Sequence, residues 1–135
     1  MTLKDIALKH LAKWPLYSKD HFVKTLEVCG GVWLGYSTTN SPRTTLSRAR
    51  LTHFDVNILN DVFFVLDICV EPQHRGKGHG DALYKVLEEI AAEAGCHKVQ
   101  MTASGWTHTG ELRMDYLLRR GYQQFGNIEV VKDVA

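Results

Sequence analysis

The chain has 135 residues, 44% of them hydrophobic, which predicts one globular domain spanning residues 1–135. A net charge of +1, from 16 Lys and Arg against 15 Asp and Glu, excludes the strongly basic field of a nucleic-acid coat protein. The three cysteines are odd in number and widely spaced, which argues against a disulfide scaffold.

No metal, membrane or nucleic-acid partner is expected from the sequence. The Cys96-His97 pair lacks a second pair at zinc spacing, and no run approaches the roughly 18 apolar residues of a membrane span. The N-terminus lacks the pattern of a secretory signal, so we expect a cytoplasmic protein, either a monomer or a homodimer. Arg43, Arg48 and Arg50 form a local basic cluster, which a solvated sheet edge explains better than a nucleic-acid contact.

The first two elements in chain order are predicted to be helices. Apolar residues recur at helical spacing over residues 3–14, and Pro15 ends that helix. A second helix is predicted over residues 18–29, with Ser18 as its N-cap and Gly30-Gly31 as its end.

Three strands are predicted to follow, over residues 32–38, 46–59 and 62–70. The Asn60-Asp61 pair between the second and third strands is typical of a hairpin turn. The third strand is nearly all apolar, with Asp67 as the interruption. Such a strand is expected at the centre of a sheet, buried on both faces.

The segment that follows, residues 70–80, reads Val-Glu-Pro-Gln-His-Arg-Gly-Lys-Gly-His-Gly and leads into an amphipathic helix. Glycines at alternate positions let the backbone turn sharply and approach a ligand closely. The helix start offers unpaired N–H groups and the positive end of its dipole, and Arg75 and Lys77 add positive charge. The combination predicts a phosphate-binding loop. A ligand-free connection would explain one glycine at a helix start, but not three with two flanking cations.

Two common phosphate-binding loops are excluded by their spacing. A P-loop in this register needs glycine where the chain has Glu71, and Ser or Thr where it has Gly78. The dinucleotide fingerprint needs its third glycine at a position occupied here by Asp81 or Leu83.

The rest of the chain alternates between helices and strands. The helix after the loop carries an apolar stripe from residue 83 to residue 94 and ends at Gly95. A strand over residues 98–103, a helix over 107–120 and a strand over 122–131 complete the order ααβββαβαβ. A helix between two strands implies a parallel crossover, and hairpins imply antiparallel pairs. The predicted fold class is therefore α/β (α+β), with a mixed sheet and helices on both faces.

The loop also matches the pattern Gln/Arg-x-x-Gly-x-Gly/Ala, as Gln73-His74-Arg75-Gly76-Lys77-Gly78, between a strand that continues into Val-x-Pro and a helix. In this register the chain resembles the acyl-CoA loop of the GNAT N-acetyltransferase superfamily, over roughly residues 62 to 125. The resemblance implies a mostly antiparallel central sheet and acetyl-CoA as cosubstrate. The chain starts at the first helix, so the family's first edge strand is missing or hidden.

In that family the strand before the loop carries a bulge and separates from its neighbour, and its free backbone groups bind pantetheine. The resemblance gives this role to Ile68, Cys69 and Val70, and an N–H near Cys69 or Val70 would also meet the thioester oxyanion. The loop would bind the pyrophosphate. The cofactor-binding residues implied there are Gln73, His74, Arg75, Gly76, Lys77, Gly78, His79 and Gly80.

The chemistry of acyl transfer to an amine calls for a general base. A free lysine-like amine, with a pKa of about 10.4, is mostly protonated at neutral pH. Asp67 is the first candidate base because a carboxylate inside an apolar strand is costly without a purpose; a structural hydrogen bond or ion pair is the alternative. His53 and Asp55, on one face of the preceding strand, form a second candidate pair, with a satisfied imidazole as the alternative for His53.

A proton donor is harder to assign, because the chain departs from the family pattern Phe-Tyr-x-x-x-Gly-Phe in the fourth helix. Here Leu117 stands at the tyrosine position and Tyr116 at the phenylalanine position, and Gly110 replaces a common asparagine. The resemblance leaves Tyr116, Ser104 or His108 as donors, or a thiolate that leaves unaided. We select Tyr116, together with Asp67, as the catalytic candidates.

The sequence as a whole predicts an acetyl-CoA-dependent N-acetyltransferase that acetylates a primary amine by direct transfer in a ternary complex. No cysteine has an evident activating base beside it, so a covalent acyl-enzyme is not expected. The acceptor stays open among a small metabolite amine, a protein amine and a modified nucleobase. The alternative function is a non-catalytic acyl-CoA-binding or sensor module of the same fold.

Overall fold

A computed structural model describes residues 1–38 and 51–134 of the chain. The basic cluster of Arg43, Arg48 and Arg50 and the first part of the predicted 46–59 strand lie outside the described residues.

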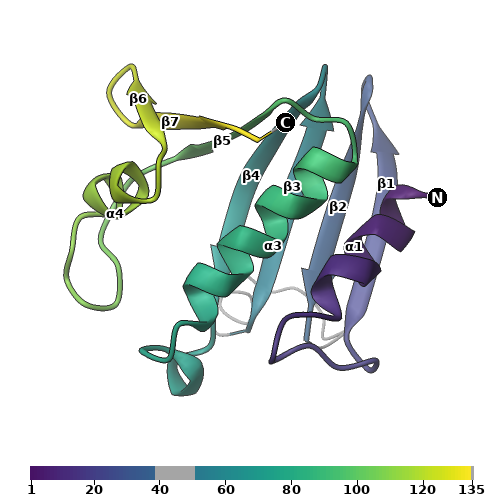
Figure 1. Cartoon of the computed structure of the whole chain (residues 1–135), viewed down its shortest axis with the longest axis horizontal. Helices are drawn as coiled ribbons and strands as arrows, with labels where there is room; N and C mark the ends of the chain where they lie inside the picture. The colour runs from purple at the N-terminus through teal and green to yellow at the C-terminus, as the bar shows by residue number, and fades with distance from the viewer. Residues whose placement is uncertain (39–50, 135) are drawn as a thin grey trace.

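A seven-stranded sheet in the order β1-β2-β3-β4-β5-β7-β6 forms the centre of the molecule (Figure 1). Strand β4 pairs with β5 in parallel and every other adjacent pair is antiparallel, so the sheet is mixed and mostly antiparallel, as predicted. The strands are β1 (Phe22–Val28), β2 (Gly31–Ser37), β3 (His53–Leu59), β4 (Val62–Cys69), β5 (Lys98–Thr102), β6 (Gln123–Phe125) and β7 (Glu129–Asp133).

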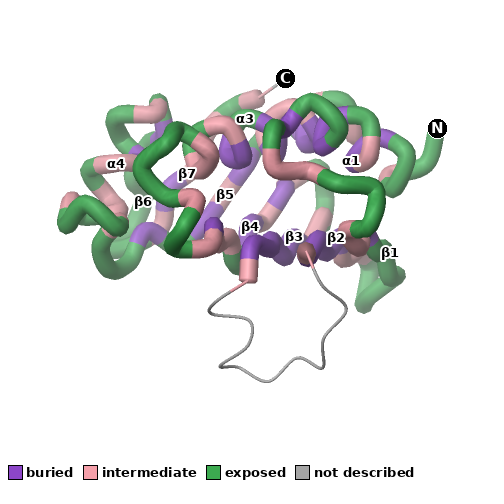
Figure 2. The backbone as a smooth tube through the Cα atoms, turned by 90° about the horizontal axis from the view of Figure 1, so that it is seen from below, coloured by how far each residue is buried: buried purple, intermediate pink, exposed green. Residues whose placement is uncertain are grey.

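The described helices are α1 (Leu3–Leu11), α3 (His79–Glu93) and α4 (Arg113–Arg119), with a short 3-10 turn, η1, at Pro72–His74. A capping box starts α1, because Thr2 and Asp5 exchange side-chain-to-backbone hydrogen bonds of 3.1 Å. Helices α1 and α3 lie side by side over the same face of β1–β4 (Figures 1 and 2). Within the described residues, no helix has the length and apolar character that crossing a bilayer requires.

The hydrophobic core fills the space between the sheet and these two helices (Figure 2). The ring of Tyr36 meets Trp14 edge-on at 6.2 Å and stacks on Phe54 at 5.3 Å. Trp14 also donates its Nε1–H to the carbonyl of His79, at 3.0 Å, which ties the end of the α1 segment to the first residue of α3. The fully buried side chains include Leu11, Leu34, Tyr36, Phe54, Phe63, Leu83, Leu87 and Ile90.

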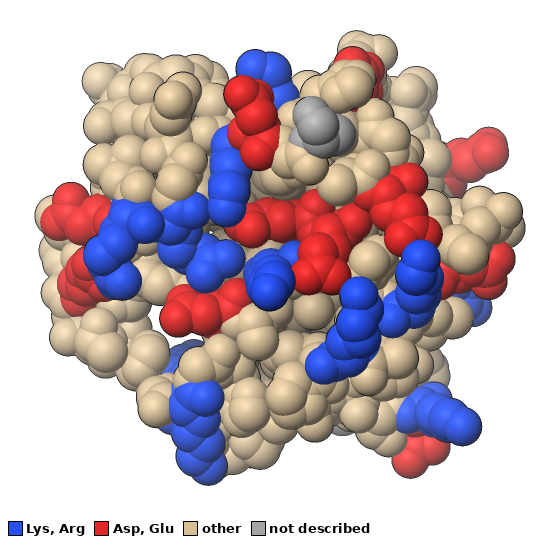
Figure 3. Space-filling model, in the orientation of Figure 1, with Lys and Arg blue, Asp and Glu red and all other residues tan. Residues whose placement is uncertain are grey.

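The surface above this core carries both positive and negative side chains, several of which form ion pairs. Figure 3 shows Lys and Arg interspersed with Asp and Glu across the face that α1 and α3 present. Lys9 bonds Glu93 at 2.8 Å and Lys13 bonds Glu89 at 3.1 Å. His10 lies between the same two carboxylates, with Nδ1 3.1 Å from Glu89 and Nε2 3.0 Å from Glu93. These contacts join α1 to α3.

Three element predictions are wrong. Residues 18–29 do not form a helix: they hold β1, which turns at Gly30 (φ 77°) into β2 and supplies the edge of the sheet. The 122–131 strand is divided into β6 and β7 by a turn at Gly126 (φ 69°). The last helix begins at 113 rather than 107. Among the described residues the order is therefore αββββαβαββ, with η1 before α3.

Candidate active site

The architecture of the site begins with a bulge in β4. Asp55 pairs with Asp67 and Val56 pairs with Val65, so Leu66 is the extra residue of β4. Parallel pairing between β4 and β5 runs from Val62 to Val65 and ends there in the described part of the sheet. Leu66 is 57% exposed and Asp67 is also exposed, so the prediction of burial on both faces fails for this half of the strand.

The glycine loop follows β4 directly and has an open backbone. Gly76 and Gly78 take φ values of 79° and 80°, a left-handed conformation that favours glycine. Gly78 is the N-cap of α3 and supplies no side-chain cap, which leaves the helix's first N–H groups available to a ligand. A Cβ placed at 76, 78 or 80 would meet nothing within 4 Å, so the backbone of these glycines borders open space.

A cavity of about 650 Å³ lies where β4 leaves β5, between the loop and α4. The predicted cofactor residues that line it are Ile68, Cys69, Val70, Arg75, Gly76, Gly78 and Gly80. The other predicted loop residues, Gln73, His74, Lys77 and His79, do not line this cavity. The Gln73 side chain donates instead to Glu71 at 2.6 Å.

The two catalytic candidates are separated by the structure. Tyr116 lines the cavity and Asp67 does not. Asp67 accepts a hydrogen bond from His53 Nε2 at 2.8 Å, and His53 Nδ1 donates to the carbonyl of Leu51 at 2.7 Å. Contacts at both ring nitrogens fix the orientation of the His53 imidazole between the two strands. Ligand atoms of His53, Asp55 and Asp67 lie within 4.8 Å of one another, so the three form one cluster on β3 and β4.

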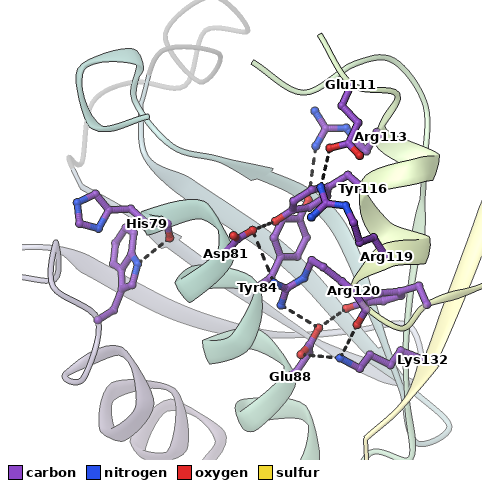
Figure 4. Close-up of polar contacts among 12 residues, drawn as sticks. His79, Asp81, Tyr84, Glu88, Glu111, Arg113, Tyr116, Arg119, Arg120 and Lys132 are labelled. Atoms are coloured by element: carbon purple, nitrogen blue, oxygen red, sulfur yellow. Dashed lines mark hydrogen bonds and ion pairs between the residues drawn. The ribbon is translucent and has the colours of Figure 1, made fainter. Parts of the chain in front are cut away.

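A second polar cluster lies at the cavity wall between α3 and α4 (Figure 4). The hydroxyl of Tyr116 donates to Asp81 Oδ1, and burial together with this bond raises the pKa of Tyr116. Arg113 Nη1 is 3.5 Å from the hydroxyl of Tyr84, whose pKa burial also raises. The guanidinium of Arg120 lies over the Tyr84 ring, 5.2 Å from its centroid.

Below this cluster, Glu88 holds α3 to the end of the chain (Figure 4). It accepts from Tyr122 at 2.8 Å and from Lys132 at 3.2 Å, and Arg120 Nη2 lies 3.5 Å away. The network fixes α4 and β7 against α3, and so sets the far wall of the cavity.

The loop before α4 completes the cavity rim. Trp106, 66% exposed, makes an isolated bridge to Leu112, and Gly110 turns the chain with a φ of 84°. This turn is why the helix predicted from residue 107 starts only at 113. Of the alternative donors, His108 lines the cavity, whereas Ser104 does not: its carbonyl accepts from Arg113 Nε at 3.2 Å.

Sequence reasoning missed several residues of this wall. They are Asp81, Tyr84, Glu111, Arg113 and Arg119. The only local signal was on α3, where Asp81 and Tyr84 are three residues apart and therefore neighbours on one helix face. The contacts to α4 depend on tertiary packing.

Similarity to known proteins identifies the family of this chain. A model of the acetyltransferase (GNAT) family matches residues 27–122. The chain belongs to the GNAT acetyltransferase family. Among curated protein sequences, no match to this GNAT chain is found.

Solved GNAT structures share the fold at low sequence identity. PaiA N-acetyltransferase from Thermoplasma acidophilum, in complex with coenzyme A, is 14% identical with a TM-score of 0.53; the match covers 75% of this chain and 59% of that one. An acetyltransferase from Bacillus cereus ATCC 14579 is 13% identical with a TM-score of 0.52, covering 97% and 88%. An aminoglycoside 6′-N-acetyltransferase complexed with coenzyme A is 15% identical with a TM-score of 0.50, covering 76% and 73%. This chain therefore spans less than two thirds of the length of PaiA.

Proposed function

We propose that this GNAT protein is an acetyl-CoA-dependent N-acetyltransferase that transfers an acetyl group to a primary amine. The observation that carries the proposal is the cavity at the β4 bulge. It brings the part of β4 beyond its pairing with β5, a helix start without a side-chain cap and a set of ionisable side chains together around one space of about 650 Å³. A site of this size suits a small cosubstrate and its acceptor.

The cofactor is proposed to lie along β4 and across the loop. The diphosphate would sit at the backbone of Gly76, Gly78 and the start of α3, where N–H groups and the helix dipole favour an anion. The pantetheine arm would run beside Ile68, Cys69 and Val70, whose backbone lies past the end of the pairing with β5. The remaining loop residues predicted to bind, Gln73, His74, Lys77 and His79, would contribute through charge or loop shape only.

Transfer is proposed to be direct. The neutral amine attacks the thioester carbonyl, a backbone N–H near Cys69 or Val70 stabilises the oxyanion, and the C–S bond then breaks. Cys69 is the cysteine at the cavity, and burial raises the pKa of its thiol, which keeps it protonated and weakly nucleophilic at neutral pH. Steady-state kinetics should therefore show a ternary complex rather than a ping-pong pattern.

Two side chains are proposed to handle protons. Tyr116 would turn its single O–H from Asp81 toward the leaving thiolate and donate a hydrogen bond there, since its raised pKa keeps the hydroxyl protonated. Asp67 would take the amine proton through water; its side chain is 54% exposed, and His53 holds one carboxylate oxygen in place. Because Asp67 lies outside the cavity lining, its effect on turnover should be the smaller of the two.

One observation favours a non-catalytic acyl-CoA-binding module instead. Leu117, at the position where the family often has tyrosine, is fully buried in the core, so no side chain from that position reaches the cavity. In this second function, Tyr116 and Asp81 would only hold α4 against α3.

The test combines ligand binding with product analysis. Acetyl-CoA and CoA at 100 times their dissociation constants should each stabilise the protein by about 2.7 kcal/mol, whereas NAD should give no shift. Acetyl-CoA consumption is then measured with a panel of amines, and acetylated products are identified by mass spectrometry. Binding with turnover supports the enzyme, and binding without turnover on any amine supports the sensor. No shift with CoA contradicts both.

A further inference from the structure

We propose that Arg75 is a specificity-determining residue that makes binding of the pantetheine arm conditional on the diphosphate. It would do so by occupying the strand edge that pantetheine needs. This inference rests on the proposed function, because it assumes a CoA thioester in the cavity.

The contact that carries the inference is between Arg75 and the end of β4. Arg75 Nε donates to the carbonyl of Val70 at 2.8 Å, and Nη2 lies 3.9 Å from Cys69 Sγ. Val70 directly follows β4, beyond the point where pairing with β5 ends. Both Val70 and Arg75 line the cavity. The guanidinium therefore covers the acceptor that lies along the proposed pantetheine path.

The same side chain belongs to the phosphate-binding loop. Arg75 immediately precedes Gly76, whose positive φ begins the turn into α3. A guanidinium binds phosphate in bidentate fashion and more strongly than it binds a neutral carbonyl. A diphosphate arriving at the loop would thus compete for Arg75 and release the Val70 carbonyl to a pantetheine amide N–H. A thioester without the diphosphate has no such compensation and must displace the guanidinium alone.

The prediction is that removing Arg75 moves two affinities in opposite directions. Arg75→Ala should weaken CoA by about tenfold or more, because a charge-assisted contact to phosphate is lost. The same change should tighten pantetheine by about 3- to 10-fold, the range expected for removing one competing hydrogen bond. Arg75→Met, which keeps the length of the stem without charge or donor, should act in the same way.

Titrations followed by amide NMR suit this test because they read millimolar dissociation constants and locate the bound ligand. Pantetheine-induced shifts should centre on residues 68–70, and CoA should add shifts at residues 76–80. Lys77→Ala is the matched control: Lys77 is an exposed cation of the same loop that does not line the cavity. It should weaken CoA modestly through lost charge and leave pantetheine unchanged.

The outcomes separate this inference from the proposed function. The inference is overturned if pantetheine binds Arg75→Ala and Arg75→Met no tighter than wild type, or binds none of the three. It is also overturned if Lys77→Ala gives the same gain. If wild-type protein fails to bind CoA, the proposed function falls and this inference falls with it.

Discussion

The two halves of β4 have different neighbours: one half is part of the packed sheet, and the other half lies at the candidate site. From Val62 to Val65 the strand pairs with β3 on one side and β5 on the other, and Phe63 is fully buried. From Leu66 to Cys69 it keeps its pairing with β3, is exposed at Leu66 and borders the cavity at Ile68 and Cys69. The first half anchors the sheet, and the second half presents backbone to a ligand.

The bulge at Leu66 is what allows one strand to do both. It adds a residue opposite the Asp55–Val56 step and bends the strand there. The ionisable side chains follow the same division: two clusters, one on β3 and β4 and one between α3 and α4, flank the second half of the strand. Substitutions in the first half should therefore change stability, and those around the second half should change binding or turnover.

The largest effect is expected on stability, from a substitution in the buried first half of β4. Phe63→Ala removes a fully buried ring from the core and should lower the free energy of unfolding by about 3–5 kcal/mol. Leu66→Ala, in the same strand but 57% exposed, should change it by about 0.5 kcal/mol or less. Urea unfolding of both variants measures the difference. Equal losses would show that the bulge residue belongs to the core after all.

The second largest effect is expected on turnover, at the cavity wall. Tyr116→Phe should reduce kcat about 100-fold, the lower end for general acid–base catalysis, with little change in CoA affinity. Because the pKa of Tyr116 lies above its ordinary value, the hydroxyl stays protonated through neutral and mildly alkaline pH. The kcat–pH profile of the variant should therefore be lower but similar in shape. Asp67→Asn is the companion variant, expected to lose less.

An unchanged kcat in Tyr116→Phe would remove this residue from the chemistry. The hydroxyl would then serve only as the partner of Asp81, and the sensor function would gain support. The kcat itself distinguishes these cases, because Tyr116→Phe loses the bond to Asp81 in both.

The two halves of β4 were not equally predictable from sequence. The apolar run 62–70 predicts a central strand, and glycine spacing with two cations predicts the loop, because both signals are local. The exposure of Leu66 and Asp67 has no such signal: it follows from the pairing of β4 with β3 and from the end of its pairing with β5.

The wrong elements have the same origin. Phe22 and Leu26 suit a helix by their spacing, yet they also suit alternate positions of a strand, and only pairing with β2 decides between the two. In the site, Asp81 and Tyr84 were visible as helix neighbours, but their contacts with Tyr116 and Arg113 arise from packing between distant segments. The position of Asp67 outside the cavity likewise depends on the register of β4 against β3.

A moderate effect is expected at the loop that joins the second half of β4 to α3. Gly78→Ala places a side chain at a φ of 80°, which should cost about 1–2 kcal/mol even though its Cβ would meet nothing within 4 Å. Gly80→Ala, inside α3 with equal open space and no positive φ, should be neutral or stabilising by up to about 1 kcal/mol. Thermal unfolding compares the pair. Similar values for both would mean that the loop tolerates a different backbone.

The smallest effect on stability is expected at the ion pairs that join α3 to α1. Partial burial raises the pKa of Glu89, but hydrogen bonds from Lys13 and His10 outweigh it and leave the pKa below its ordinary value of 4.5. A lowered carboxyl pKa means that the stabilisation is complete above that ordinary value and is lost as the pH falls through the folded-state pKa. With Glu89 about a third exposed, Glu89→Gln should cost about 0.5 kcal/mol near neutral pH and progressively less as the pH falls below 4.5. Glu27→Gln, exposed on β1, should leave the acid dependence as in wild type. If Glu89→Gln cost as much at pH 3 as at neutral pH, the loss would not come from the ion pairs of Glu89. Packing between α1 and α3 would then account for their contact.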